Sequence, residues 1–311
     1  MNGTVAVAVA GASAAALTPA AAALARRVGV LDWPGELKVH SQAVPYLGGL
    51  GVLAGLGPVV AFTRPAFVLP IMLAVLLGLA DDVREVPARV RLVCEILIGV
   101  VAALLLDTAN VAAGLAVVAL VVLLVNAVNM LDGLDALAGS VALVGAVGFA
   151  IVLSGPNRGV ALGGAAALAG FLLWNRPPAR IYLGDSGSYL VGVTLALLLS
   201  SAIVDEPGAT SIASLLFVGV PVGDAVIAVV RRARNGAPLF TGDRAHVYDQ
   251  LVDRGLPAAT VTIACAAAQA LLVAAGITAA GFELGSASWV VGVVIVSCGA
   301  AALWQFARVT R

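Results

Sequence analysis

Two amides and two carboxylates recur at a stride of three residues in the segment 126–140, which reads NAVNMLDGLDALAGS. They are Asn126, Asn129, Asp132 and Asp135, and they follow a long apolar run. A stride of three keeps side chains on roughly one face of a helix. A carboxylate at the middle of a bilayer costs about 3 kcal/mol on insertion scales. The segment is therefore predicted to lie where a membrane helix meets water, with its acids turned toward a ligand, most simply a divalent cation.

A pair of aspartates ends another apolar run. Asp81 and Asp82 follow that run directly in GLADDVREVPARVRLVCEI, and Arg91 comes soon after them. Adjacent carboxylates repel each other, and the C-terminal end of a helix disfavours negative charge. The placement favours metal or phosphate chemistry, with a solvated helix end as the alternative.

A third polar stretch, NRPPARIYLGDSGSYLVG, contains an aspartate between glycines. Asp185 lies between Gly184 and Gly187, and Tyr182 precedes it by three residues. A helix that begins at such a site leaves free backbone N–H groups beside a carboxylate. This arrangement suits a metal ligand next to a bound phosphate, and simple N-capping by Asp185 is the alternative.

Two basic loops contain the two histidines of the chain. The loop after the first apolar run carries Lys38, a candidate phosphate-binding cation, and His40. A longer loop, preceded by Asp224 inside an apolar run, carries Arg244 and His246 and is suited to binding an anionic head group at the membrane surface. Ordinary anchoring by basic inner loops is the alternative for both.

The elements that must position these residues are membrane helices. The chain has 311 residues, of which 61% are hydrophobic and 11% charged, whereas a soluble domain carries about 25% charged residues. Apolar runs near 20 residues predict an all-α polytopic membrane protein with eleven helices, or ten as the alternative, in a single domain over residues 1–311. The predicted spans are 4–25, 44–62, 66–80, 89–107, 110–128, 137–154, 159–174, 186–203, 209–230, 258–281 and 285–307.

The basic residues are distributed very unevenly between alternate loops. With the N-terminus outside, fifteen of the seventeen Lys and Arg residues lie in or beside the inner segments, and Arg64 and Arg158 lie in outer ones. Cytoplasmic loops carry the excess of Lys and Arg in membrane proteins. Nearly all the unusual polar residues belong to the same inner loops. We therefore expect an active site on the cytoplasmic face of the plasma membrane.

At these residues the chain resembles the polyprenyl-phosphate N-acetylhexosamine-1-phosphate transferases, glycosyltransferase family 4. The resemblance runs in order from about Asp32 to Asp253. It implies transfer of a sugar-1-phosphate, most simply N-acetylglucosamine-1-phosphate, from a UDP-sugar to undecaprenyl or decaprenyl phosphate, with release of UMP, as the initiating step of cell-wall or surface-glycan synthesis. It also implies Mg²⁺, with Mn²⁺ as an alternative. The implied partners are the UDP-sugar, the polyprenyl phosphate and the membrane, with no nucleic acid, and a homodimer is left open.

The resemblance implies a role for each matching residue. Those matched to catalytic positions are Asp81, Asp82, Asp132, Asp135 and His246. Those matched to substrate-binding positions are Lys38, His40, Arg91, Asn126, Asn129, Asn175, Tyr182 and Arg244. Asp185, joined by Asp132, matches the Mg²⁺ ligand. The paired aspartates would engage or deprotonate the lipid phosphate, and Tyr182 falls where the family places a Phe that stacks on uracil.

The chain departs from the family pattern at three places. After His246 the residues 247–249 read Val-Tyr-Asp, so the later histidines of the His-x-His-His motif are absent. Ala136 replaces the second Gly of the DGxDG motif, and Glu95 stands where Gln is common. The muramoyl-pentapeptide branch carries three histidines in this loop, so the UDP-N-acetylglucosamine branch is the closer match and the muramoyl-pentapeptide donor is the alternative.

Three other classes of membrane protein fit less of the sequence. Aromatic prenyltransferases need two Asp-rich motifs with wider spacing and do not account for LGDSGS. CDP-alcohol phosphotransferases need an Ala-Arg pair after their DG, which LDGLDALAGS lacks. A cation transporter, the non-enzymatic alternative, places its acids near the middle of its spans, whereas here they cluster at helix ends.

Overall fold

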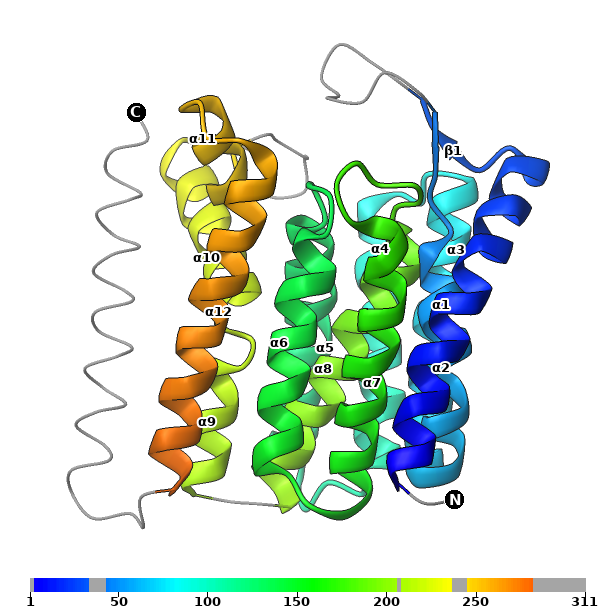
Figure 1. Cartoon of the computed structure of the whole chain (residues 1–311). Helices are drawn as coiled ribbons and strands as arrows, with labels where there is room; N and C mark the ends of the chain where they lie inside the picture. Colours follow the sequence, from blue (N-terminus) through cyan, green and yellow to red (C-terminus); the bar gives the residue numbers. More distant parts are fainter. Residues whose placement is uncertain (1–2, 34–42, 206–207, 237–244, 282–311) are drawn as a thin grey trace.

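Long helices run up and down between two ends of the molecule (Figure 1). The computed structural model describes residues 3–33, 43–205, 208–236 and 245–281. The helices are α1 Gly3–Val28, α2 Gly48–Thr63, α3 Val68–Val83, α4 Ala88–Leu105, α5 Val111–Leu131, α6 Leu137–Val152, α7 Gly155–Asn175, α8 Gly184–Asp205, α9 Ala209–Leu216, α10 Gly219–Arg234, α11 Val247–Asp253 and α12 Ala258–Gly281. A 3-10 turn, η1 Pro65–Phe67, leads into α3, and two short antiparallel strands, β1 Leu31–Asp32 and β2 Val44–Pro45, pair before α2.

Helix α8 is the central element of the fold. Every residue from Ser186 to Ala202 is buried, because the small and apolar side chains of this helix cover all its sides and leave no polar stripe for water. Helices α2, α3, α5, α6, α7 and α9 all pack against it. The first residues of α8 are therefore surrounded by the ends of several other helices.

Glycines let two neighbouring helices approach the start of α8 closely. A Cβ atom on Gly49 of α2 would collide with the backbone of Gly187, and one on Gly78 of α3 would collide with the backbone of Asp185. Only a residue without a side chain allows two backbones to come this close. The start of α8 is thus held against α2 and α3 by backbone contact.

The apolar runs predicted between residues 4 and 281 each lie mainly on helices, with two differences. The run 44–62 begins with strand β2, and helix α2 starts only at Gly48. The run 209–230 is interrupted at Phe217 and Val218, where α9 and α10 meet at a bend of 65°. Within the described residues, five helices are long and apolar enough to cross a membrane, or six if α9 and α10 form one bent span. The protein is an all-α membrane protein. The run 285–307 lies outside the described residues, and the count of eleven spans stays a prediction.

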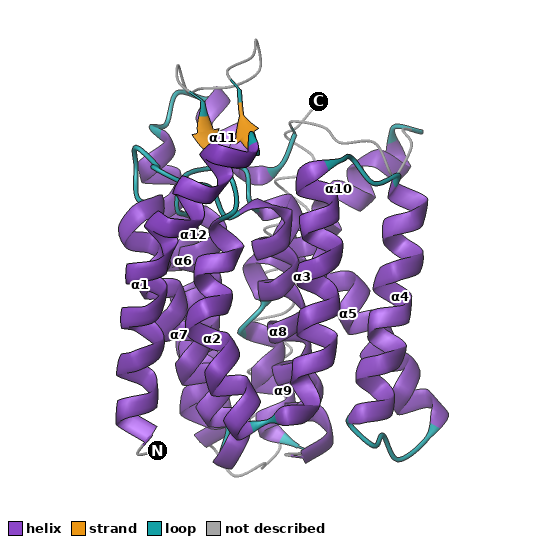
Figure 2. Ribbon diagram, turned by 90° about the vertical axis from the view of Figure 1, so that its right-hand side faces the viewer, coloured by secondary structure: helices purple, strands orange, loops and turns teal. Residues whose placement is uncertain are grey.

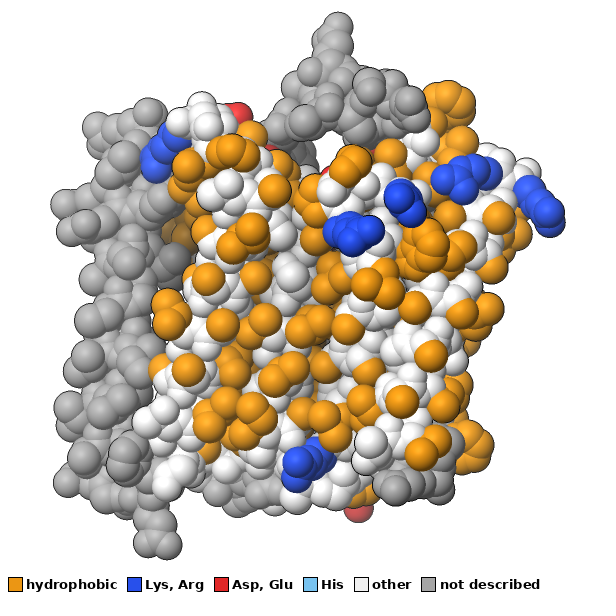
Figure 3. Space-filling model, in the orientation of Figure 1, with side chains coloured by type: hydrophobic (Ala, Val, Ile, Leu, Met, Phe, Trp, Pro, Cys, Tyr) orange, Lys and Arg blue, Asp and Glu red, His pale blue; other side chains and the backbone are white. Residues whose placement is uncertain are grey.

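The two ends of the molecule differ in composition. One end carries α11 and the strands β1 and β2, and the other carries the N-terminus and α9 (Figures 1 and 2). On the face shown in Figure 3, Lys and Arg side chains gather mainly near the end with α11 and β1, and hydrophobic side chains cover the belt between the ends. An apolar belt between more basic ends is the pattern expected of helices that cross a bilayer.

Candidate active site

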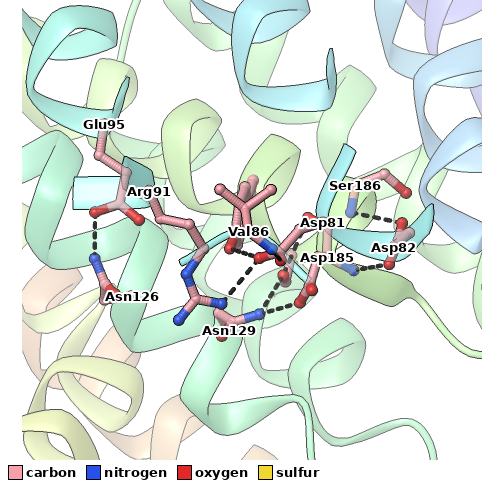
Figure 4. Close-up of polar contacts among 11 residues, drawn as sticks. Asp81, Asp82, Val86, Arg91, Glu95, Asn126, Asn129, Asp185 and Ser186 are labelled. Carbon is pink, nitrogen blue, oxygen red and sulfur yellow. Dashed lines mark hydrogen bonds and ion pairs between the residues drawn. The ribbon is translucent and has the colours of Figure 1, made fainter. Parts of the chain in front are cut away.

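The C-terminal end of α3 and the N-terminal end of α8 meet through one carboxylate. Asp82 Oδ1 accepts a hydrogen bond from the backbone N–H of Asp185 at 2.8 Å, and its Oδ2 accepts one from the backbone N–H of Ser186 at 3.0 Å (Figure 4). The first N–H groups of a helix have no partner within the helix. Asp82 therefore caps α8 from a different helix, and α8 begins at Gly184, whose φ of 73° places it in the left-handed region.

Its neighbour Asp81 has a second set of partners on α4, on α8 and in the loop after α3. Asp81 Oδ2 accepts hydrogen bonds from Arg91 of α4 at 2.9 Å and from the Tyr189 hydroxyl of α8 at 2.8 Å, and Oδ1 accepts one from the Val86 N–H at 2.7 Å. The Asp81 side chain is 4% exposed, whereas that of Arg91 is 30% exposed. Arg91 thus neutralises a buried carboxylate while its own side chain stays partly exposed.

The two asparagines of α5 reach different helices. Asn129 Nδ2 donates to Asp185 Oδ1 at 2.5 Å and to Ser188 Oγ at 3.1 Å. Asn126, one turn earlier, donates to Glu95 of α4 at 2.6 Å. Asn129 therefore orients Asp185, and Asn126 ties α5 to the helix that carries Arg91 (Figure 4).

The DG turn, residues 132–136, follows α5 directly. Helix α5 ends at Leu131, so Asp132 and Asp135 lie in this turn. The stride of three predicts that they share a helical face with the two asparagines, and that prediction is wrong. Asp132 takes a non-helical conformation at the C-cap of α5, and Ala136, the residue before α6, has a φ of 62°, in the left-handed region. Asp135 Oδ2 accepts a hydrogen bond from the Ala179 N–H at 2.9 Å.

The Asp132 carboxylate has a different environment from its neighbours. Among the described residues, none donates a hydrogen bond to it. Desolvation raises the pKa of Asp132, and the nearby charges of Asp185, Asp82 and Asp135 raise it further. The carboxylates of Asp82, Asp132, Asp135 and Asp185 thus form one acidic region at this end of the helix bundle, and a bound cation would stabilise them together.

Asn175 and Tyr182 hold the LGDSGS loop in place. Asn175 is buried; its Oδ1 accepts from the Ala136 N–H at 3.0 Å and its Nδ2 donates to the Ile181 carbonyl at 2.9 Å. Tyr182 pairs through its backbone with Pro45 and Gly48, next to strand β2. Desolvation and the nearby charge of Asp135 raise the pKa of the Tyr182 hydroxyl. The Tyr182 side chain therefore borders the acidic region. Asn175 links the loop to the DG turn through its bonds to Ile181 and Ala136.

His246 lies at the start of α11 and is buried against α10. Its Nδ1 lies 2.7 Å from Asp224 Oδ2, and its ring stacks on the Tyr248 ring with a centroid separation of 5.5 Å. The Tyr248 hydroxyl donates to the Met130 carbonyl at 3.0 Å, at the edge of the DG turn. His246 is therefore connected to the acidic region through Tyr248. Lys38, His40 and Arg244 lie outside the described residues.

Three contributors were not predicted from the sequence. Ser188 and Tyr189 follow Asp185 by three and four residues, so they lie one turn away on the same helix and can share its partners. Tyr248 was noted only as a replacement for histidine, yet its hydroxyl bonds to Met130 and its ring covers Gly133. The spacing from Asp185 could have identified the first two, whereas nothing local in the sequence relates Tyr248 to the DG turn.

The donor set suits a divalent cation that is partly held by its substrate. Among the described residues, no group of three or more His, Cys, Asp and Glu side chains is arranged to hold a metal ion on its own. Mg²⁺ commonly takes only one or two carboxylates together with substrate phosphates. Asp185 and Asp132 fit that requirement best among the described carboxylates. Both oxygens of Asp81 and of Asp82 accept hydrogen bonds from the protein, whereas Asp185 accepts one at Oδ1 from Asn129.

Comparison with known proteins identifies the family. The sequence pattern of the family described as "Glycosyl transferase family 4" matches residues 65–203, a range that includes the paired aspartates, the DG turn and Asp185. An "Undecaprenyl-phosphate alpha-N-acetylglucosaminyl 1-phosphate transferase" of Thermotoga maritima is 33% identical over 240 residues, covering 75% of this chain and 76% of the relative.

Two other relatives have similar names. A Bacillus subtilis protein named "Probable undecaprenyl-phosphate N-acetylglucosaminyl 1-phosphate transferase" is 29% identical over 266 residues, covering 77% of this chain and 74% of the relative. A "Decaprenyl-phosphate N-acetylglucosaminephosphotransferase" of Mycolicibacterium smegmatis is 28% identical over 287 residues, covering 75% and 71%. Since these matches extend over most of both chains and agree with the family pattern across the site, this chain belongs to glycosyl transferase family 4.

Proposed function

We propose that this protein transfers N-acetylglucosamine-1-phosphate from UDP-N-acetylglucosamine to a polyprenyl phosphate in a Mg²⁺-dependent reaction that releases UMP. In the transfer, a bond forms between a phosphate oxygen of the lipid and the phosphorus that bears the sugar. The bond between that phosphorus and the oxygen of the UMP phosphate breaks, and UMP leaves with the electron pair. The reaction needs no oxidant, reductant or further co-substrate.

One observation carries the proposal. The carboxylates of Asp82, Asp132, Asp135 and Asp185 come from three separate parts of the chain and lie close enough to influence one another at one end of the bundle. Such a concentration of negative charge is unfavourable unless a cation joins it. Two phosphorylated substrates bring further negative charge to the site, which makes the need for the cation greater.

The residues of this chain have distinct tasks in the proposed reaction. Asp185 and Asp132 would hold Mg²⁺, which would neutralise charge on the phosphate oxygens as transfer proceeds. Asn129 keeps Asp185 in one orientation through their 2.5 Å hydrogen bond. Arg91, whose side chain is partly exposed, would offer a cation to a phosphate group. Tyr182, at the border of the acidic region, is suited to contact the nucleotide.

The names of the relatives support the donor and the acceptor. Those of T. maritima, B. subtilis and M. smegmatis all name N-acetylglucosamine transfer, and they name undecaprenyl or decaprenyl phosphate as the lipid. A panel of UDP-N-acetylglucosamine, other UDP-amino sugars and UDP-muramoyl-pentapeptide, each assayed for UMP, tests the donor. We expect the highest rate with UDP-N-acetylglucosamine.

The principal experiment measures UMP release by purified protein with UDP-N-acetylglucosamine, undecaprenyl phosphate and Mg²⁺. We expect release that stops on chelation of Mg²⁺ and is lost in Asp185→Asn. Asp205→Asn is the matched control, because Asp205 lies at the opposite end of the same helix and pairs with Arg64. Absence of UMP with every donor, from a protein that is folded, would refute the proposed activity.

The same proposal places the site on the cytoplasmic face of the plasma membrane. The basic residues near the end of the molecule that carries α11 and β1 support that orientation. Single cysteines at the exposed positions Glu85, near the site, and Ala109, at the other end, can be introduced into a variant lacking the native cysteines. An impermeant maleimide added to intact cells should label Ala109→Cys and leave Glu85→Cys unmodified. The reverse pattern would invert the topology.

A further inference from the structure

Asp224 contacts His246 and the next residue, Val247, through its two carboxylate oxygens. It lies on α10, and its Oδ2 is 2.7 Å from Nδ1 of His246. Its Oδ1 accepts a hydrogen bond from the Val247 N–H at 2.8 Å. The side chains of Asp224 and His246 are 4% and 5% exposed. The contact is thus a buried pair that joins α10 to the first residues of α11 (Figure 1).

The chemistry of this pair determines which ring nitrogen carries a proton. Asp224 Oδ1 accepts from the Val247 N–H, and an aspartate carboxylate in its ionised form has no proton to donate through Oδ2. Nδ1 of His246 must therefore be the donor. The described contacts of His246 involve Nδ1 and the ring face, so Nε2 is the nitrogen left to meet a substrate.

A second contact fixes the plane of the imidazole ring. The Tyr248 ring lies parallel to it, with an angle of 6° between the planes. Tyr248 is itself held by its hydroxyl bond to the Met130 carbonyl, and a Cβ atom on Gly133 would collide with its ring. His246 is therefore clamped between Asp224 on one side and the DG turn, through Tyr248, on the other.

We propose that Asp224 is a positioning residue that holds His246 with Nδ1 protonated and so presents Nε2 to a phosphate group bound beside the DG turn. The inference rests on the proposed function for the identity of that phosphate group. A carboxylate that orients a histidine controls its tautomer and ring direction together. The loss of the later histidines makes the orientation of the remaining one more important, because no second imidazole follows it in 247–249.

The first experiment is a double-mutant cycle on UMP release. Asp224→Asn should lower kcat about 10- to 100-fold, the usual cost of losing an orienting partner, with little change in KM for the nucleotide sugar. His246→Ala should lower it by about 10²- to 10⁴-fold. Because Asp224 acts through His246, the double variant should be no slower than His246→Ala alone. Additive losses would overturn the proposal.

The control for this cycle is Asp253→Asn. Asp253 ends α11, the short helix that begins just after His246, and is exposed. This substitution therefore makes the same chemical change near His246 without touching it. It should leave kcat and the pH profile as in the wild type. Asp224→Asn should change the pH profile of kcat, an effect that a purely structural role would not produce.

The second experiment observes the tautomer directly. The chain has two histidines, so His40→Gln leaves His246 as the single source of imidazole ¹⁵N signals. NMR of this protein without substrate should show a proton on Nδ1, and Asp224→Asn should shift or split that signal. A neutral ring protonated only at Nε2, with Asp224 in place, would refute the inference. This readout does not depend on catalysis, so it separates failure of the positioning role from failure of the proposed function.

Discussion

The backbone N–H of Asp185 donates to the carboxylate of Asp82 at 2.8 Å, although the two aspartates lie 103 residues apart. One carboxylate thus caps the helix that begins with the other. This relationship gives Asp82 a task that does not require contact with substrate. It also means that any movement of α3 relative to α8 would displace the candidate Mg²⁺ ligand.

Removing this cap should lower stability and activity together. Asp82→Ala leaves two N–H groups at the start of α8 without acceptors, and loss of a cap of this kind costs about 0.5–2 kcal/mol. We expect a lower midpoint of thermal unfolding in detergent and a large loss of UMP release. Asp82→Asn keeps one acceptor oxygen and should lie between Asp82→Ala and the wild type in stability.

Glu85→Ala provides the control for the two Asp82 variants, since Glu85 lies three residues further on, just beyond the end of α3, and is exposed. It should match the wild type in both measurements. If Asp82→Ala unfolds at the same temperature as Glu85→Ala, the cap does not contribute to stability, and the role of Asp82 must be sought in catalysis alone.

Asn129 should affect the use of Mg²⁺ more than the fold. Its amide donates to Asp185 and to Ser188, and loss of a group that orients a metal ligand typically costs about 10- to 100-fold in metal affinity or activity. We expect Asn129→Ala to need more Mg²⁺ for half-maximal UMP release. Ser188→Ala removes only the second partner and should shift the Mg²⁺ titration less. Equal shifts in the two variants would argue against the role assigned to Asn129.

Much of the fold follows from the local character of the sequence. The apolar runs predict the helices because each run is long enough to form a helix that is buried in the protein or crosses the membrane. The start of α8 at Gly184 follows from glycines flanking an acid, and the placement of Asp81 and Asp82 at the end of α3 follows from the run before them. These are relations between neighbours along the chain.

The pairings within the site could not be predicted in the same way. Whether Asp82 caps α8, or Asn126 meets Glu95, depends on how helices pack, and a stride of three residues does not specify that packing. The stride also suggested that Asp132 and Asp135 continue a helical face. The helix instead ends before them, because the turn is fixed by contacts with distant parts of the chain such as Tyr248 and Ala179.

The network around Asp81 should show strong coupling between partners. Arg91→Ala leaves a buried carboxylate without its cation, and removing one partner of such a hydrogen bond costs about 1–3 kcal/mol. In the background of Asp81→Asn, which has no charge to neutralise, the same substitution should cost much less. Measured unfolding free energies should therefore give a coupling of about 0.5–3 kcal/mol. Additivity within about 0.5 kcal/mol would show that the ion pair contributes little to stability.

Ala136 offers a test in which a substitution is expected to stabilise the protein. Its φ of 62° lies in the left-handed region, which costs an L-residue about 1–2 kcal/mol and glycine almost nothing. Ala136→Gly should therefore raise the midpoint of thermal unfolding, partly offset by the greater freedom of glycine in the unfolded chain. The resemblance to the family predicts glycine at this position for the same physical reason.

The comparison that decides this last case is Ala142→Gly, at a buried position within α6. There the backbone is helical, so glycine should lower stability by about 1 kcal/mol. The two identical substitutions are thus expected to act with opposite sign, six residues apart, and both can be measured in one series of melting curves. A lower melting midpoint for both would mean that the turn at Ala136 relaxes without cost and that its left-handed conformation is not a source of strain.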